Sequence, residues 1–179
     1  GTGEPLDNFD NLFTFISMLT DEHGLHISQR NLTISTCGIV PNMRKLADKQ
    51  LQLTLAVSLH APTQEQREGL MPVAGKYPLE QVMDAARYYF SKTGRRITYE
   101  YALVGGQNDG PKDAAALAGL LKGQNCHVNL IPVNPVRERD YVQSERETIV
   151  NFKNKLEKCG INVTIRREMG RDIDGACGQ

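Results

Sequence analysis

The chain has 179 residues, of which 40% are hydrophobic and 23% are charged, values typical of one globular domain with a sizeable core. Lysine plus arginine number 21, as do aspartate plus glutamate, and this zero net charge is not that of a typical basic nucleic-acid-binding domain. The sequence shows no apolar run long enough for a membrane helix, no signal-peptide pattern at GTGEPLDNFD and no CxxC pair among four cysteines, which predicts reduced thiols in a cytoplasmic protein.

Helix and strand patterns alternate from the start of the chain. Apolar residues at helical spacing predict a helix over 6–19, and the β-rich segment NLTIST predicts a strand over 31–36. Pro41 is placed to begin a short helix that runs to about Lys49. The near-continuous apolar run LTLAVSLH predicts a strand over 53–60 that is covered on both faces.

The same alternation continues in the second half. An amphipathic pattern predicts a helix over 79–92, and RRITYEYALV predicts the strand that follows. A helix is expected from Pro111, and HVNLIPV predicts a strand over 127–133. Ser144 with Glu147 has the spacing of a capping box, which predicts a helix to Lys158 before a last strand, INVTIRR.

This order of elements predicts an α/β protein. Strands that alternate with helices form a parallel sheet with right-handed crossovers, either an open doubly wound sheet or a (β/α) barrel. No GxGxxG or P-loop pattern follows any predicted strand, which argues against mononucleotide binding.

Polar residues gather where the predicted strands end, which is where both architectures bind ligands. Ser35, Ser58, His60 and Asn134 follow strands, and Glu4 precedes a helix as the end of a strand would. Together they suit a small ligand with an amine, a carboxylate and sugar hydroxyls. Each also has a structural interpretation, since Ser58 could cap a helix, His60 could be a core group and Asn134 could hold a turn.

Cys177 stands among small residues in GRDIDGACGQ, a setting typical of a thiol that another molecule must approach. His23 and His26 are three residues apart without a third ligand, so no metal site is predicted. No GxSxG pattern indicates a serine hydrolase.

Several segments resemble one known family. SLHAP, VNLIPVNPV, ISTCGIVPNMRKLAD and IRREMGRDIDGACGQ are similar to the radical-SAM adenine methyltransferases of the RlmN type. That family methylates carbon 2 of an adenine in 23S rRNA and, in some members, of a tRNA adenine. A related methylase that modifies carbon 8 shares much of the pattern, and IRREMGRDID looks closer to the carbon-2 group.

The resemblance implies that residues 1–179 are a radical-SAM core fragment, the C-terminal portion of a (β/α)6 partial TIM barrel with a parallel sheet and outer helices. It also implies residues that bind S-adenosylmethionine, namely Gly3, Glu4, Ser35, Ser58, Leu59, His60 and Asn134. Cys177 matches the cysteine that carries the methyl group. In the family, one S-adenosylmethionine methylates this thiol, and a [4Fe-4S] cluster splits a second to a radical that activates the S-methyl group toward adenine.

The CxxxCxxC cluster motif does not occur in this sequence, and three cluster ligands cannot be assembled from its four cysteines at their spacings. We therefore expect a piece of a longer enzyme, without the first strands, the cluster loop and an N-terminal RNA-binding domain, and inactive alone. The parent is expected to act on 23S rRNA or tRNA with a flavodoxin-type electron donor and no membrane. A non-catalytic nucleotide- or RNA-binding half-barrel stays open, as does, more weakly, an aldolase-like barrel with a lysine Schiff base.

Overall fold

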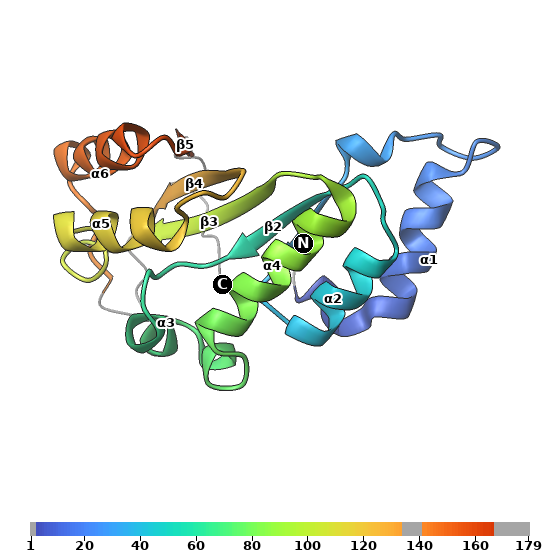
Figure 1. The fold of residues 1–179 in the computed structure, drawn as a ribbon, viewed down its shortest axis with the longest axis horizontal. Coiled ribbons are helices and arrows are strands. Elements are labelled where there is room, and N and C mark those ends of the chain that lie inside the picture. Colours follow the sequence, from blue (N-terminus) through green and yellow to red (C-terminus); the bar gives the residue numbers. More distant parts are fainter. Residues whose placement is uncertain (1–2, 134–140, 167–179) are drawn as a thin grey trace. The chain divides into compact units, whose positions relative to one another are not determined.

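The computed structural model describes residues 3–133 and 141–166. Its strands form a five-stranded sheet in the order β1-β2-β3-β4-β5, and the pairs β1–β2 and β4–β5 are parallel (Figure 1). The predicted α/β class with a parallel sheet is therefore confirmed. The strands are β1 Thr33–Thr36, β2 Thr54–Ser58, β3 Ile97–Leu103, β4 Cys126–Pro132 and β5 Asn162–Ile165.

The chain divides into two compact units, which are described separately. The first comprises Gly1–Ser58 and Met71–Thr98, and the second comprises Leu59–Leu70 and Tyr99–Gln179. No helix in the described ranges is long and apolar enough to cross a lipid bilayer.

In the first unit, helices α2 and α4 pack against each other (Figure 1). Helix α4 is amphipathic, and its apolar face points into the core. Val82, Met83 and Tyr89 on this face are each 1% exposed or less. Helix α4 stops at Gly94, whose φ of 65° is the left-handed conformation that glycine adopts freely. The helical elements of this unit are η1 Pro5–Asn8, α1 Phe9–Thr20, η2 Gln29–Asn31, α2 Val40–Asp48, η3 Pro72–Gly75 and α4 Leu79–Thr93.

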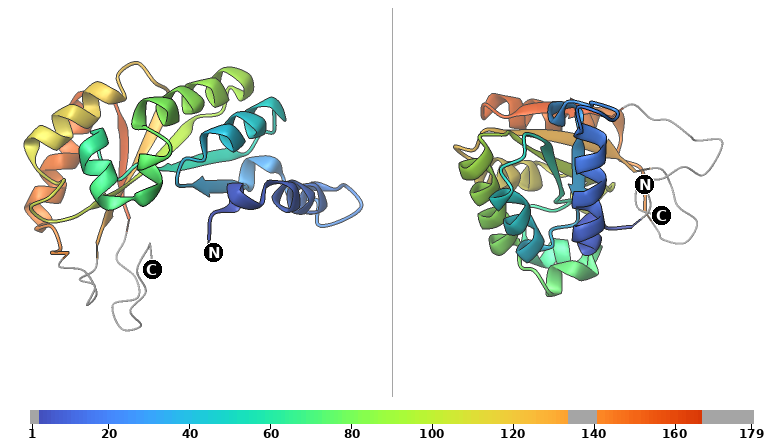
Figure 2. Two further views of the ribbon diagram at one scale, coloured as in Figure 1. Left: turned by 90° about the horizontal axis from the view of Figure 1, so that it is seen from below. Right: turned by 90° about the vertical axis from the view of Figure 1, so that its right-hand side faces the viewer.

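In the second unit, helix α6 packs on β5 and on α5, which lies beside it (Figure 2). Every second residue of β3 is buried, and Tyr101 is one of them. The centroid of its ring lies 5.3 Å from that of the Phe152 ring. The helices of this unit are α3 Gln64–Leu70, α5 Pro111–Leu120 and α6 Arg146–Lys158.

Two details differ from the sequence predictions. Helix α3 was not expected, because its buried residue is Arg67, a charged side chain where a helical pattern would show an apolar one. The capping box of Ser144 with Glu147 is wrong, since α6 begins at Arg146 with Glu145 as N-cap and no side-chain cap.

The segment before α6 explains that second difference. Gln143 pairs with Val104 in an antiparallel bridge, and the Gly105 amide donates to the Val142 carbonyl at 2.7 Å. These contacts keep the segment extended and turn Ser144 inward, where its hydroxyl is buried and has no hydrogen-bond partner among the described residues. A buried hydroxyl in this position cannot serve as the cap of a surface helix.

Candidate functional site

Glu4 joins the start of the chain to the end of β1. Its Oε1 accepts a hydrogen bond from the Leu6 amide at 3.0 Å, which caps η1, and its Oε2 accepts from the Cys37 amide at 2.7 Å. The carbonyl of the buried Leu6 in turn accepts from the Asn42 side chain of α2 at 2.7 Å. The carboxylate is therefore fixed at the carboxyl end of a strand.

Both Glu4 oxygens keep capacity for a further donor. An ionised carboxylate offers about four lone-pair positions, and the two backbone amides occupy two of them. Gly3, which precedes Glu4, has a φ of 93°, a left-handed value that disfavours any other residue there. This geometry suits a ligand ammonium group that approaches the carboxylate beside a compact backbone.

Ser35 and Ser58 stand on one face of the β1–β2 pair. The parallel register places Ser35 opposite Ala56, and Ser58 follows Ala56 by two residues, which returns its side chain to the same face. The opposite face of β1 carries Ile34 and Thr36, which are both buried. Two hydroxyls thus share one face of this pair, on which Ser35 is exposed and Ser58 is half-buried, while Ala56 between them is buried.

In the second unit, both the backbone and the ring of His60 form hydrogen bonds with β3. The Leu59 and His60 amides both donate to the Glu100 carbonyl, at 2.9 and 3.2 Å, and the Ala102 amide donates to His60 Nδ1 at 3.0 Å. A backbone amide can only donate, so Nδ1 carries no proton and the neutral ring holds its proton on Nε2. Leu59 is fully buried, so its side chain belongs to the core.

The surroundings of His60 keep its ring neutral. Desolvation by burial is the larger cause and the positive charge of Arg67 the smaller, and together they lower the pKa of His60 from 6.5 to about 4. Near neutral pH the ring is therefore an uncharged hydrogen-bond donor through Nε2. Such a group can bind a carboxylate or a sugar hydroxyl without adding charge to the site.

Two predicted site residues, Asn134 and Cys177, lie outside the described ranges, so their roles stay predictions. Residues 3–133 and 141–166 contain no group of three or more histidine, cysteine or acidic side chains that could hold a metal ion. The three cysteines in these ranges, Cys37, Cys126 and Cys159, form no disulfide with one another.

One residue that bonds to His60 was not among the predicted site residues. Asn108 follows β3 in the turn GGQND and is only 1% exposed, although asparagine in a turn is normally on the surface. Its side chain donates to the His60 carbonyl at 2.8 Å. The residue type gave no signal of this burial, because any turn asparagine reads the same in a sequence.

Comparisons with known proteins identify the family of this chain. The family model of the radical SAM superfamily matches residues 1–118. A probable dual-specificity RNA methyltransferase RlmN of Lachnospira eligens is 64% identical over all 179 residues, and one of Clostridium novyi is 55% identical. The chain spans about half the length of these curated relatives, 51% and 52% respectively.

Solved structures are similar as well. A radical SAM methyltransferase from Sphaerobacter thermophilus matches with a TM-score of 0.95 and 42% identity, over the whole chain and 52% of that protein. A domain of pyruvate-formate lyase-activating enzyme from Bacteroides vulgatus shares the fold alone, with a TM-score of 0.68 and 15% identity. The parallel α/β sheet, the polar strand ends and the family match over residues 1–118 lead to one conclusion: this chain belongs to the radical SAM superfamily.

Proposed function

We propose that this chain is part of an enzyme that methylates carbon 2 of an adenine in RNA, with S-adenosylmethionine and a [4Fe-4S] cluster as cofactors. The observation that carries the proposal is its match, over every residue, to RNA methyltransferases of the RlmN type at up to 64% identity. Residues 1–179 are then a fragment of the radical-SAM core domain, as the resemblance of its motifs implies.

The described strand ends fit S-adenosylmethionine. Glu4, held by two backbone amides beside Gly3, would accept from the ammonium group of the methionine moiety. His60, neutral with its proton on Nε2, would donate to the carboxylate or to a ribose hydroxyl. Ser35 and Ser58 supply hydroxyls for the same polar groups, and Leu59 holds the backbone between Ser58 and His60 in the core. Asn134 is assigned to this set by its sequence motif alone.

Cys177 is the residue to which we assign the methyl-accepting thiol. It stands between Gly175-Ala176 and Gly178, a setting of small residues typical of a thiol that a reactant must approach, and its family motif matches closely. A methyl cation does not add to the electron-poor carbon 2 of adenine, and this is the reason a thiol is needed as intermediate carrier. Bound S-adenosylmethionine supplies the methyl group and, with the reduced cluster, a radical.

The cluster itself finds no ligand set in the described ranges. The chain's own contribution would be to bind and orient: Glu4 would accept from an ammonium group, and His60 would donate to a carboxylate or a hydroxyl. Positioning of this kind accounts for much of the rate of a multi-step reaction. The prediction that this fragment is inactive by itself follows from the missing motif. A flavodoxin-type electron donor and a cytoplasmic location also stay predictions.

The test of the function is the identity of the methylated nucleoside. A strain without the gene would be complemented with the full-length protein, and the adenosines of its 23S rRNA and tRNA would be separated by mass spectrometry. We expect methylation at carbon 2, in rRNA and, for a dual-specificity enzyme, in tRNA too. Methylation at carbon 8 would identify the alternative methylase, and unmethylated RNA would favour a non-catalytic half-barrel.

The same strains carry a matched control. Cys177→Ala should abolish the modified nucleoside, whereas Cys159→Ala, which removes an exposed thiol at the end of α6, should leave it unchanged. Retention of methylation in the Cys177→Ala strain would contradict the assignment of the methyl carrier.

A further inference from the structure

The side chain of Asn108 makes three hydrogen bonds to two neighbouring segments. Its Oδ1 accepts from the Val104 amide at 2.8 Å, and its Nδ2 donates to the carbonyls of Ala102 at 2.7 Å and His60 at 2.8 Å. An amide nitrogen has two hydrogens, so these two carbonyls saturate it. The buried side chain thus ties the end of β3 to the segment that follows β2.

His60 needs such a tie because its backbone is in an uncommon conformation. Its φ of 59° lies in the left-handed region, which residues other than glycine adopt rarely and only where their surroundings hold them. The amide of His60 bonds to Glu100, and its carbonyl bonds to Asn108, so both of its peptide groups are held from outside. Of these two hydrogen bonds, the one to Glu100 is between backbone groups, and the one from Asn108 comes from a side chain.

Ala102 links the two residues into a closed circuit. Its amide donates to His60 Nδ1 at 3.0 Å, while its carbonyl accepts from Asn108 Nδ2 at 2.7 Å. Asn108 thereby holds, through one side-chain amide, both the His60 carbonyl and the carbonyl of Ala102, the residue whose own backbone amide selects the tautomer of the His60 ring. Loss of the amide would free the His60 backbone to leave its left-handed conformation and move Nδ1 off the Ala102 amide.

We propose that Asn108 is a positioning residue that holds His60 in its left-handed conformation with the proton on Nε2, ready to bind S-adenosylmethionine. The part of this inference that concerns the ligand rests on the proposed function, whereas the part that concerns the tautomer does not. A merely structural role in closing the GGQND turn would leave the His60 ring unchanged.

The decisive variant is Asn108→Ala in the full-length protein, with Asn108→Ser as a second variant in case the first does not fold. The matched control is Tyr101→Phe, because the Tyr101 hydroxyl donates to the backbone carbonyl of Asn108 at 2.8 Å. This control weakens the same turn but leaves the contact between the Asn108 side chain and His60 in place.

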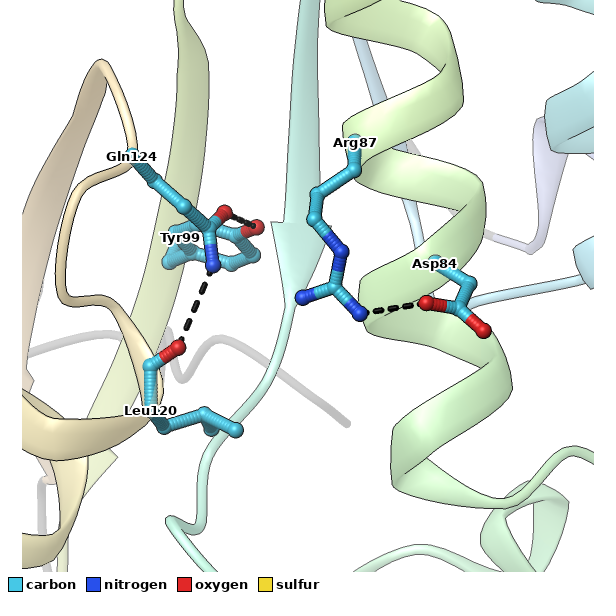
Figure 3. A network of polar contacts seen from close by, with 5 residues as sticks. All are labelled: Asp84, Arg87, Tyr99, Leu120 and Gln124. Carbon is cyan, nitrogen blue, oxygen red and sulfur yellow. Dashed lines mark hydrogen bonds and ion pairs between the residues drawn. The ribbon is translucent and has the colours of Figure 1, made fainter.

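A second control is Tyr99, two residues before Tyr101 in β3. The Tyr99 hydroxyl donates to Gln124, whose side-chain amide donates to the Leu120 carbonyl (Figure 3). Tyr99→Phe therefore removes one hydrogen bond from the same strand and leaves the Asn108 side chain and its three hydrogen bonds unaltered. It reports how far a general loss of strand stability alters the measurements.

The first measurement is the nitrogen NMR spectrum of His60 in the ligand-free protein near neutral pH. We expect a single tautomer with the proton on Nε2 in the wild type and both controls, and a mixture of two tautomers in the Asn108 variants. An unchanged single tautomer in those variants, or a wild-type proton on Nδ1, would overturn the inference whatever the protein binds.

The second measurement is the affinity for S-adenosylmethionine by calorimetry. Loss of Asn108 should weaken binding about tenfold, the effect of about one well-placed hydrogen bond, while the two tyrosine variants bind as the wild type does. Equal affinity in the wild type and the Asn108 variants would refute the positioning role in binding. A wild type that binds no S-adenosylmethionine would refute the proposed function instead, and the NMR spectrum would still decide the tautomer.

Discussion

Replacement of Glu4 by glutamine tests the anchor of the proposed cofactor site. Glutamine has nearly the same shape, but only one of its two terminal atoms can accept a hydrogen bond. The carboxylate of Glu4 accepts from two amides, Leu6 at 3.0 Å and Cys37 at 2.7 Å, so Glu4→Gln must leave one of them facing an NH2 group.

The size of the effect follows from those two contacts. A hydrogen bond to a charged group contributes about 1.5–3 kcal/mol, and the half-buried position of Glu4 favours the lower end. A local loss of about 1.4 kcal/mol raises the population of the open state about tenfold. We therefore expect at least one of the Leu6 and Cys37 amides to exchange with solvent about tenfold faster in the variant.

Hydrogen exchange of the full-length protein, followed amide by amide, measures this directly. Asp7→Asn is the matched control, because it removes the same charge from an exposed residue of the same short helix, η1. Exchange of both amides should be nearly unchanged in that control. Unaltered protection of Leu6 and Cys37 in Glu4→Gln would refute the anchoring role of the carboxylate.

Two further changes probe the second unit. Gly105→Ala would bring a Cβ to 2.9 Å from the Val142 carbonyl oxygen, so we expect a loss of about 1–3 kcal/mol, seen as a lower Tm, whereas Gly119→Ala meets no atom within 4 Å and should not destabilise. An equal Tm for both variants would be evidence against the close contact at Gly105. Because the folded-state pKa of His60 is lowered from 6.5 to about 4, its stabilising contribution is complete above pH 6.5 and is lost as the pH falls toward 4. The Tm of His60→Gln should accordingly fall less than that of the wild type across this window, and parallel pH curves would contradict the lowered pKa of His60.

The helices that the sequence predicted best are those with a regular apolar period and a clear stop. The prediction of 79–92 agrees with α4, Leu79–Thr93, because one face is apolar throughout and Gly94 takes a left-handed φ. Helix α3 was not predicted because its contacts are polar. Gln66 donates to Asp113 at 2.8 Å, and the buried residue of the helix is Arg67. Polar packing between segments distant in sequence leaves no periodic signal.

The candidate site shows the same division. The strand ends could be predicted, since parallel strands bring their carboxyl ends to one edge and polar residues there stand out. The conformation of His60 could not be, because its φ of 59° depends on Glu100, Ala102 and Asn108, which lie about forty residues or more further along the chain. The second role of Glu4, as acceptor for the Cys37 amide, is likewise visible only once the chain has folded.

Peptide mass spectrometry of Cys177 tests the central claim most directly, namely that this chain carries the methyl-accepting thiol of an RNA methyltransferase. The full-length protein would be purified from cells that supply its cofactors and digested, and the Cys159 peptide would serve as internal control. We predict a gain of one methylene group on Cys177 and none on Cys159. Cys177 recovered without a methyl group from protein that is actively methylating RNA would contradict the claim.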